Sequence, residues 1–126
     1  MKQVPAVFLI LWSISLGSWA DSVREIDHLL DFIGSSRCTF VRNGEEHDAA
    51  AARTHIEGKY DYARRWIQTA EQFIEYAATK SSLSGSPYHV ICSGREESSF
   101  DWLMRELSLF RARSAHNGDE ERRYST

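Results

Sequence analysis

Apolar residues recur every three or four positions in four parts of the chain, the spacing that places them on one face of an α-helix. The four stretches are residues 22–34, with Ile26, Leu29, Leu30 and Ile33; residues 47–66, with Ala49, Ala52, Ile56, Tyr60 and Ala63; a stretch from residue 69, with Ala70, Phe73, Ile74 and Ala77; and a stretch from residue 98, with Phe100, Leu103, Met104, Leu107 and Phe110. Ser22, Thr69 and Ser98 stand where capping residues belong. The pattern predicts four helices, or three if the second and third stretches form one bent helix.

Two short runs have the composition of β-strands. Residues 38–41 are apolar or β-branched, and Arg42-Asn43-Gly44 follows them; Asn-Gly is a strong signal for a tight turn. Residues 88–92 form a second such run. If the two runs pair antiparallel with Cys38 opposite Cys92, Phe40 lies across from Val90 on the same face. The predicted fold is therefore α+β and mostly helical, with three to four helices packed on a short two-stranded antiparallel element.

The end of the chain differs from the rest. Residues 114–126 carry no apolar period, and we expect them to be a disordered polar tail. Residues 21–113 are enough for a single globular domain and too few for two. No internal sequence repeat is evident.

The first 20 residues have the features of a cleavable signal peptide. Lys2 precedes an apolar run over residues 4–16, and Ser18 and Ala20 are the small residues that a signal peptidase requires. A retained membrane anchor is the alternative, but the run is shorter than the roughly 20 residues that cross a bilayer. We predict cleavage after Ala20, with no membrane span in the exported chain.

Export changes the interpretation of the two cysteines. Cys38 and Cys92 are the only cysteines in the chain, and in an oxidising compartment such a pair usually forms a disulfide. The absence of a Cys-x-x-Cys motif favours a structural cross-link over a redox pair. We therefore expect one disulfide that staples the domain.

The charge balance argues against nucleic acid as a partner. The full chain carries 15 lysines and arginines against 18 acidic residues, and loss of Lys2 with the signal peptide leaves 14 against 18, a formal charge of −4. Basic and acidic residues alternate along the chain, whereas a nucleic-acid binder presents a basic stripe.

Four segments together resemble one known family. They are residues 38–44 (CTFVRNG), 52–60 (ARTHIEGKY), 69–74 (TAEQFI) and 81–88 (SSLSGSPY). In this order they are similar to the YfeK-like family of small, uncharacterised bacterial exported proteins, over residues 24–111. The resemblance implies a periplasmic location and brings no activity. The residues that fall on its recurring motifs are Arg42, Asn43, Gly44, His55, Lys59, Ser81, Ser82, Ser84, Gly85, Pro87 and Tyr88.

These motif residues suggest an anion site. His55 and Lys59 are four residues apart and share one helix face, and Arg42 together with the serine loop would complete a cationic pocket if both fold over that face. The candidate ligand-binding residues are Arg42, Asn43, His55, Lys59, Ser81, Ser82, Ser84 and Tyr88. The alternative is structural: the serines shape a turn, while the basic groups bond to backbone carbonyls or pair with Glu45, Glu57 or Asp61.

The sequence favours a non-catalytic binding module for an envelope component or a partner protein. The rival is a small periplasmic hydrolase that uses Ser81, Ser82 or Ser84 as nucleophile and His55 or His89 as base. No Gly-x-Ser-x-Gly elbow supports the rival, and the five histidines are too scattered to predict a metal site. We expect no cofactor and no metal, and the identity of the partner and the oligomeric state stay open.

Overall fold

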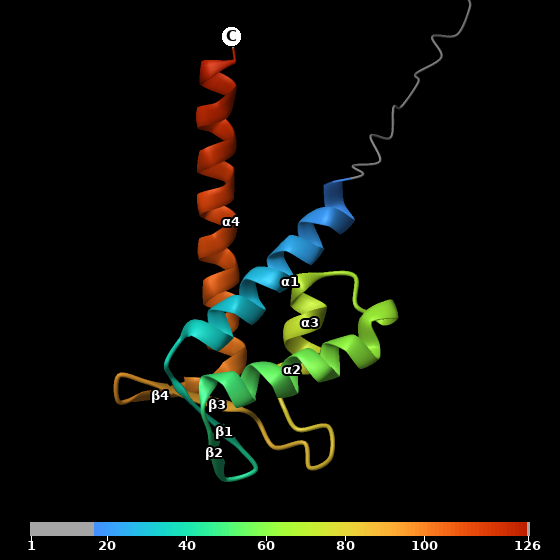
Figure 1. Ribbon diagram of the computed structural model, residues 1–126, viewed down its shortest axis with the longest axis vertical. Helices are drawn as coiled ribbons and strands as arrows, with labels where there is room; N and C mark the ends of the chain where they lie inside the picture. The colour runs from blue at the N-terminus through green and yellow to red at the C-terminus, as the bar shows by residue number, and fades with distance from the viewer. Residues whose placement is uncertain (1–16, 126) are drawn as a thin grey trace, which may run out of the picture.

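The computed structural model describes residues 17–125, which fold into four α-helices and a four-stranded sheet (Figure 1). In chain order the elements are α1 (Gly17–Ser35), β1 (Thr39–Arg42), β2 (Glu45–His47), α2 (Ala49–Ala63), the 3₁₀ turn η1 (Arg64–Trp66), α3 (Ala70–Ala77), β3 (His89–Cys92), β4 (Arg95–Ser98) and α4 (Ser99–Tyr124). The predicted α+β class is confirmed. The second and third predicted helices are separate elements, joined through η1.

Polar side chains fix where the helices begin. Asp48 accepts a hydrogen bond from Ala51 N at the start of α2, Thr69 accepts from Gln72 N at α3, and Ser98 accepts from Asp101 N at α4. Each bond satisfies an N–H group that would otherwise have no partner within its helix. The caps predicted at Thr69 and Ser98 are confirmed.

The first helix begins earlier than predicted. Residues 17–20 form its first turn, so Ser22 lies inside α1 and not at its start. Residues 17–21 contain no proline, so the helix can extend towards the amino terminus. Most of the predicted signal peptide, residues 1–16, lies outside the described residues. Cleavage after Ala20 would remove only the first turn of α1.

The sheet has four strands and not two. Its order is β2-β1-β3-β4, and every neighbouring pair is antiparallel. The two strands missed from the sequence, Glu45–His47 and Arg95–Ser98, are short, charged edge strands that lack the apolar alternation used for prediction. The central register is as expected, with Phe40 opposite Val90.

The same hairpin-to-helix unit occurs twice. The turns β1–β2 and β3–β4 have matching backbone conformations: φ is 52° at Asn43 and at Ser93, and 78° at Gly44 and at Gly94. Positive φ at both central residues is the signature of the type I′ turn, which suits the twist of a two-residue hairpin. Each second strand then leads into a capped helix, α2 or α4. The structure thus contains a repeat that the amino-acid sequence does not display.

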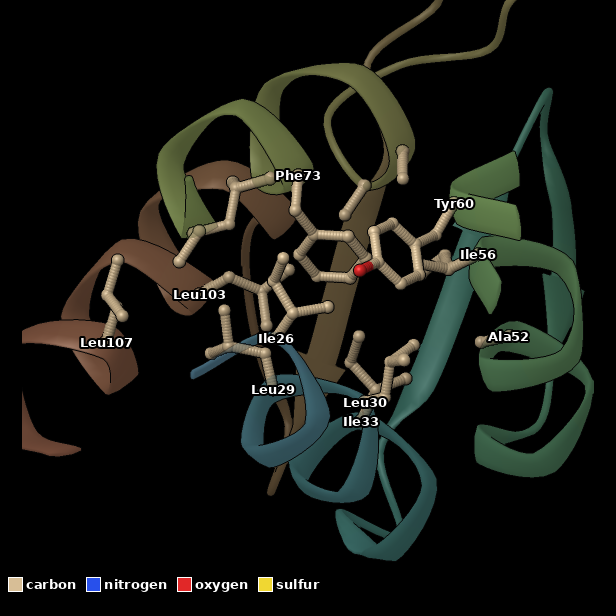
Figure 2. Packing of buried hydrophobic residues seen from close by; sticks show 14 of the residues in the cluster. Ile26, Leu29, Leu30, Ile33, Ala52, Ile56, Tyr60, Phe73, Leu103 and Leu107 are labelled. Carbon is tan, nitrogen blue, oxygen red and sulfur yellow. The ribbon is translucent and has the colours of Figure 1, made fainter. Parts of the chain in front are cut away.

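All four helices contribute to one hydrophobic core (Figure 2). Phe73 of α3 is fully buried, and its ring meets Tyr60 of α2 edge to face at 5.4 Å between centroids. The remaining large side chains come from the predicted apolar faces, chiefly Ile26, Leu29, Leu30, Ile33, Leu103 and Leu107. Burial of these faces is what fixes the helices against one another.

The predicted disordered tail is instead helical as far as Tyr124, where α4 ends (Figure 1). This part of α4 projects beyond the other helices, and its side chains from Arg111 to Tyr124 are exposed. Its Ala, Arg and Glu residues have high helix propensity, which an apolar period does not reveal. Arg111 ties the base of the projection to Glu25 Oε2 at 2.6 Å and to Glu71 Oε1 at 2.5 Å. Within residues 17–125, no helix is long and apolar enough to cross a membrane.

The predicted disulfide is present between Cys38 and Cys92, which are 54 residues apart in the sequence. Replacing both cysteines with alanine should lower the free energy of unfolding by about 4 kcal/mol, because the cross-link restricts the unfolded chain. Urea denaturation of the two proteins measures the difference. Reduced wild type should unfold at the urea concentration of the double variant, and equal midpoints without reductant would contradict the expectation.

Candidate functional site

A cleft of about 530 Å³ opens between β1 and the first half of α2. Ala50, Ala51 and Thr54 line it from the helix, and Phe40 and Arg42 line it from the strand. The volume lies within the range of small-molecule sites, roughly 300–1,000 Å³. The cleft is therefore large enough for a ligand and not only for water.

Strand register explains which side chains reach the cleft. Phe40 lies opposite Val90, so continuing the antiparallel pairing by two residues places Arg42 beside Tyr88 on the same face. Ser99 comes next across the sheet, because its N–H donates to the carbonyl of Tyr88 at 2.9 Å. Arg42, Tyr88 and Ser99 thus form one row across the strands, and all three line the cleft.

Small side chains on α2 keep the cleft open. The helix begins with four consecutive alanines, Ala49–Ala52, of which Ala50, Ala51 and Ala52 line the space. A methyl group cannot bridge the gap to the strand, whereas the larger Ile56 one turn later is buried in the core. Of these three lining alanines only Ala52 belongs to the apolar period of the helix, and together they leave the hollow open.

His55, Lys59 and Tyr88 form a hydrogen-bonded group at the α2 side of the cleft. Tyr88 Oη lies 3.1 Å from His55 Nε2 and 3.3 Å from Lys59 Nζ, and Lys59 also donates to the carbonyl of Lys80 at 3.0 Å. Because an ammonium group only donates, Tyr88 Oη accepts from Lys59, and its own proton can be donated to a neutral His55. The predicted pairing of His55 and Lys59 on one face is present.

The electrostatics of this group agree with that proton arrangement. Burial, and then the charges of Arg42 and Lys59, lower the pKa of His55 below 6.5. Burial and Arg42 likewise lower the pKa of Lys59, while burial raises the pKa of Tyr88. His55 is therefore favoured in its neutral form and Tyr88 in its protonated form.

Arg42 supplies a positive charge that no acidic side chain of the described residues neutralises. Its cross-strand neighbour Glu45 lies beside His47 instead, with 4.0 Å between Glu45 Oε2 and His47 Nε2. Among residues 17–125, no carboxylate forms an ion pair with Arg42, and neither Glu57 nor Asp61 pairs with it: Glu57 contacts Arg53, and Asp61 contacts Arg64. A guanidinium without a carboxylate, at the edge of a cleft, can hold an anion through two parallel N–H bonds.

The serines predicted for the same site have a different position. Ser84 Oγ donates to Asn43 Oδ1 at 2.5 Å, and Asn43 Nδ2 donates to Ser81 Oγ at 3.4 Å. Ser81 Oγ also accepts the N–H groups of Leu83 and Ser84, both at 3.3 Å. This network holds the loop of residues 81–86 against the β1–β2 turn. Asn43, Ser81 and Ser84 therefore lie outside the cleft lining, and Ser82 is exposed.

No serine–histidine relay is present in the described part of the chain. The hydroxyls of Ser81 and Ser84 are engaged with Asn43 and loop N–H groups, while His55 contacts Tyr88. The other candidate base, His89, has its Nδ1 3.9 Å from Glu96 Oε1. Neither histidine is placed to take a proton from these hydroxyls. Residues 17–125 also contain no group of three His, Cys, Asp or Glu side chains suited to a metal ion.

Sequence reasoning missed three polar residues of the cleft, Thr54 on α2 and two others. His47 is on the edge strand β2, and Ser99 directly follows the α4 cap. His47 Nε2 and Ser99 Oγ are both buried and have no hydrogen-bond partner among residues 17–125. No sequence signal would have singled out Ser99, because a serine beside a helix cap is ordinary.

The lowered pKa of His55 predicts a pH dependence of stability. The unfolded chain takes up a proton at His55 near pH 6.5, before the folded protein does. The stability that neutral His55 contributes is therefore complete above pH 6.5 and is lost as the pH falls from 6.5 towards the folded-state pKa. The variant His55→Gln should show a weaker decline over this window in urea unfolding. A titration of the His55 ring by NMR with a midpoint at or above 6.5 would contradict the expectation.

Comparison with known proteins identifies one family and one uncharacterised relative. No solved structure matches the chain at a significant level. An uncharacterised protein of Salmonella typhimurium (strain LT2), YfeK, is 37% identical over 92 residues, which cover 69% of this chain and 75% of the relative. The family of unknown function DUF5329 matches residues 20–111, a range that includes every cleft residue described above. The chain therefore belongs to the DUF5329 family, as its resemblance to YfeK-like proteins predicted.

Proposed function

We propose that this protein is a non-catalytic binding module whose cleft takes an anionic group of an envelope component or a partner protein. One observation carries the proposal: Arg42 opens onto a cleft that has apolar walls, and no carboxylate pairs with it within residues 17–125. Natural proteins usually pair a partly buried charge, so an unpaired one next to a ligand-sized space supports an exogenous counter-ion.

The surrounding groups suit an anion. Besides burial, the charges of Arg42 and Lys59 lower the pKa of His55, which supports a positive potential at that part of the cleft. A bound anion would be attracted by this potential and would favour protonation of His55. Eligible groups are the carboxylates of peptidoglycan peptides, phosphate groups and an acidic segment of a partner protein.

Two features support a periplasmic location. The first 20 residues have the composition of a cleavable signal peptide, with the predicted cleavage after Ala20. The Cys38–Cys92 disulfide is the kind of cross-link that persists in oxidising compartments. A periplasmic module would meet peptidoglycan and other anionic envelope components directly.

The variant Arg42→Gln tests the site. Three probes cover the eligible groups: N-acetyl-D-alanyl-D-alanine, inorganic phosphate and a glutamate-rich peptide. In wild type, at least one probe should shift backbone NMR signals around the cleft. Arg42→Gln should weaken that binding at least about tenfold, because a charge-assisted hydrogen bond contributes about 1.5–3 kcal/mol.

Arg95→Gln is the matched control, since Arg95 is exposed on β4, does not line the cleft and carries the same charge. Equal losses in the two variants would point to net charge alone. No cleft shifts with any of the three probes would argue against the proposed function.

The proposed location predicts a defined mass. Protein from the periplasmic fraction of its native host should begin at Asp21 and should react with a thiol reagent at two positions only after reduction. Intact-mass spectrometry with and without reduction measures both properties. A full-length mass in the membrane fraction, or free thiols without reductant, would contradict the periplasmic assignment.

A further inference from the structure

The two hairpin-to-helix units can be aligned residue by residue. Their turn residues Asn43 and Ser93 share one backbone conformation and stand 50 positions apart. The helix caps Asp48 and Ser98 stand the same 50 positions apart. Because no residue is inserted between turn and cap in either unit, each position at the start of α2 has a counterpart 50 positions later at the start of α4.

The cleft lies where the first unit has short side chains and the second unit has large ones. Three residues of α2 that line the cleft are Ala50, Ala52 and Thr54. Their counterparts on α4 are Phe100, Trp102 and Met104. Trp102 belongs to the hydrophobic core, and the other two pack against it. The second unit thus covers its part of the core with two aromatic rings and a thioether, whereas the first unit leaves the matching region open.

A ligand can reach the walls of this hollow. Ala50 and Ala51 are exposed on α2, and Val41 is partly exposed on the strand. The more deeply buried lining, including Phe40 and Ile56, is also apolar. A group that enters between β1 and α2 therefore meets carbon atoms on both sides, and the hydrophobic effect favours its burial there.

Arg42 is close enough to hold the charged end of the same ligand. It lies beside Tyr88 by strand register, and His55 contacts Tyr88 at 3.1 Å, so Arg42 is at the His55 end of the cleft. Ala51 precedes His55 by about one helical turn, roughly 6 Å along the axis of α2. An acid whose ring and carboxylate are joined by about two carbon atoms spans this distance.

We infer that the cleft binds a short aryl-alkyl carboxylate, with the carboxylate at Arg42 and the aromatic ring in the hollow beside Ala50 and Ala51. The inference rests on the proposed anion site and deepens it by naming the ligand class. The second unit places aromatic rings at the matching positions, and Phe40 of the cleft already packs edge to face against one of them, Trp102, at 5.6 Å between centroids. Aromatic rings pack favourably on other rings and on guanidinium groups.

Three acids test the inference in NMR titrations of the full exported chain: 3-phenylpropionate, 3-cyclohexylpropionate and propionate. Wild type should bind 3-phenylpropionate at least about tenfold more tightly than propionate, because the ring loses contact with water. It should prefer the phenyl acid to the cyclohexyl acid about two- to tenfold, because only an aromatic ring gains ring–ring and cation–π contacts. Equal or tighter binding of the cyclohexyl acid would overturn the aromatic class.

The variant Ala50→Phe gives the first unit the residue type that the second unit has at the matching position. Its ring should fill the hollow, so that 3-phenylpropionate binds no more tightly than propionate, while the affinity for propionate stays unchanged. Ala112→Phe adds the same ring to the exposed projection of α4 (Figure 1) and is the matched control, which should keep the preference for the phenyl acid. Equal losses in the two variants would contradict a ring site in the cleft.

A second variant keeps the test valid if Ala50→Phe lowers the urea midpoint of unfolding. Ala51→Leu narrows the same hollow with a residue of high helix propensity. It should likewise reduce the preference for 3-phenylpropionate over propionate. An unchanged preference in a folded Ala51→Leu variant would overturn the placement of the ring.

A peptide distinguishes two sources of the same chemistry. Acetyl-Gly-Gly-Phe carries an aromatic ring and a carboxylate at the end of a chain. Tighter binding of this peptide than of 3-phenylpropionate would indicate the C-terminal residue of a partner protein, and weaker binding would indicate a free acid. Both results keep the aryl carboxylate as the ligand class.

The outcomes separate the inference from the function on which it rests. Arg42→Gln should weaken the binding of 3-phenylpropionate at least about tenfold. If 3-phenylpropionate and propionate bind wild type equally, and both bind Arg42→Gln more weakly, the anion site remains and the aromatic ligand is wrong. If 3-phenylpropionate binds wild type and Arg42→Gln equally, or if neither the acids nor the three earlier probes bind, the anion site and the inference fail together.

Discussion

The pairing of β1 with β3 joins the two halves of this protein, and the Cys38–Cys92 disulfide locks that pairing. Each of these strands begins a hairpin, and each hairpin leads into a capped helix, α2 or α4. Because the positions of both helices follow from the two hairpins, the central strand pair also decides how α2 and α4 meet the core. A covalent bond at this pair is effective, since it restricts the long segment between the cysteines in the unfolded chain.

The same strand pair creates the candidate site. Its register places Arg42 beside Tyr88, and the next strand adds Ser99 to the row. The alanines at the start of α2 leave Arg42 beside an open cleft, and no carboxylate pairs with it among residues 17–125. An unpaired charge beside a ligand-sized space supports a bound counter-ion. This unpaired charge makes the cleft a better candidate than the serine loop, whose polar groups already satisfy one another.

Sequence patterns predicted the parts of the fold that depend on apolar periodicity. The four helices, the two central strands and the Phe40–Val90 register follow from such patterns and are all present. The disulfide, which was predicted from the two cysteines and the expected export, is present as well. The edge strands β2 and β4 were missed because they are short and charged and lack an apolar alternation. The end of α4 was misjudged because helix propensity, without a buried face, leaves no apolar period. For the site, the i and i+4 spacing of His55 and Lys59 predicted their shared face, and the structure adds Tyr88 to them, whereas the serines joined Asn43 in a separate network.

By itself, the sequence determined which faces of the helices are buried, which two strands pair and which cysteines are linked, because these depend on local periodicity and on a single possible disulfide. The tertiary structure alone decided that short alanines leave a cleft open and that, among residues 17–125, Arg42 has no carboxylate partner and Ser99 Oγ is buried without a hydrogen bond. These properties depend on distances between residues that are far apart in the chain. A linear pattern can state which residues are polar, but only the packed structure shows which polar groups remain unsatisfied.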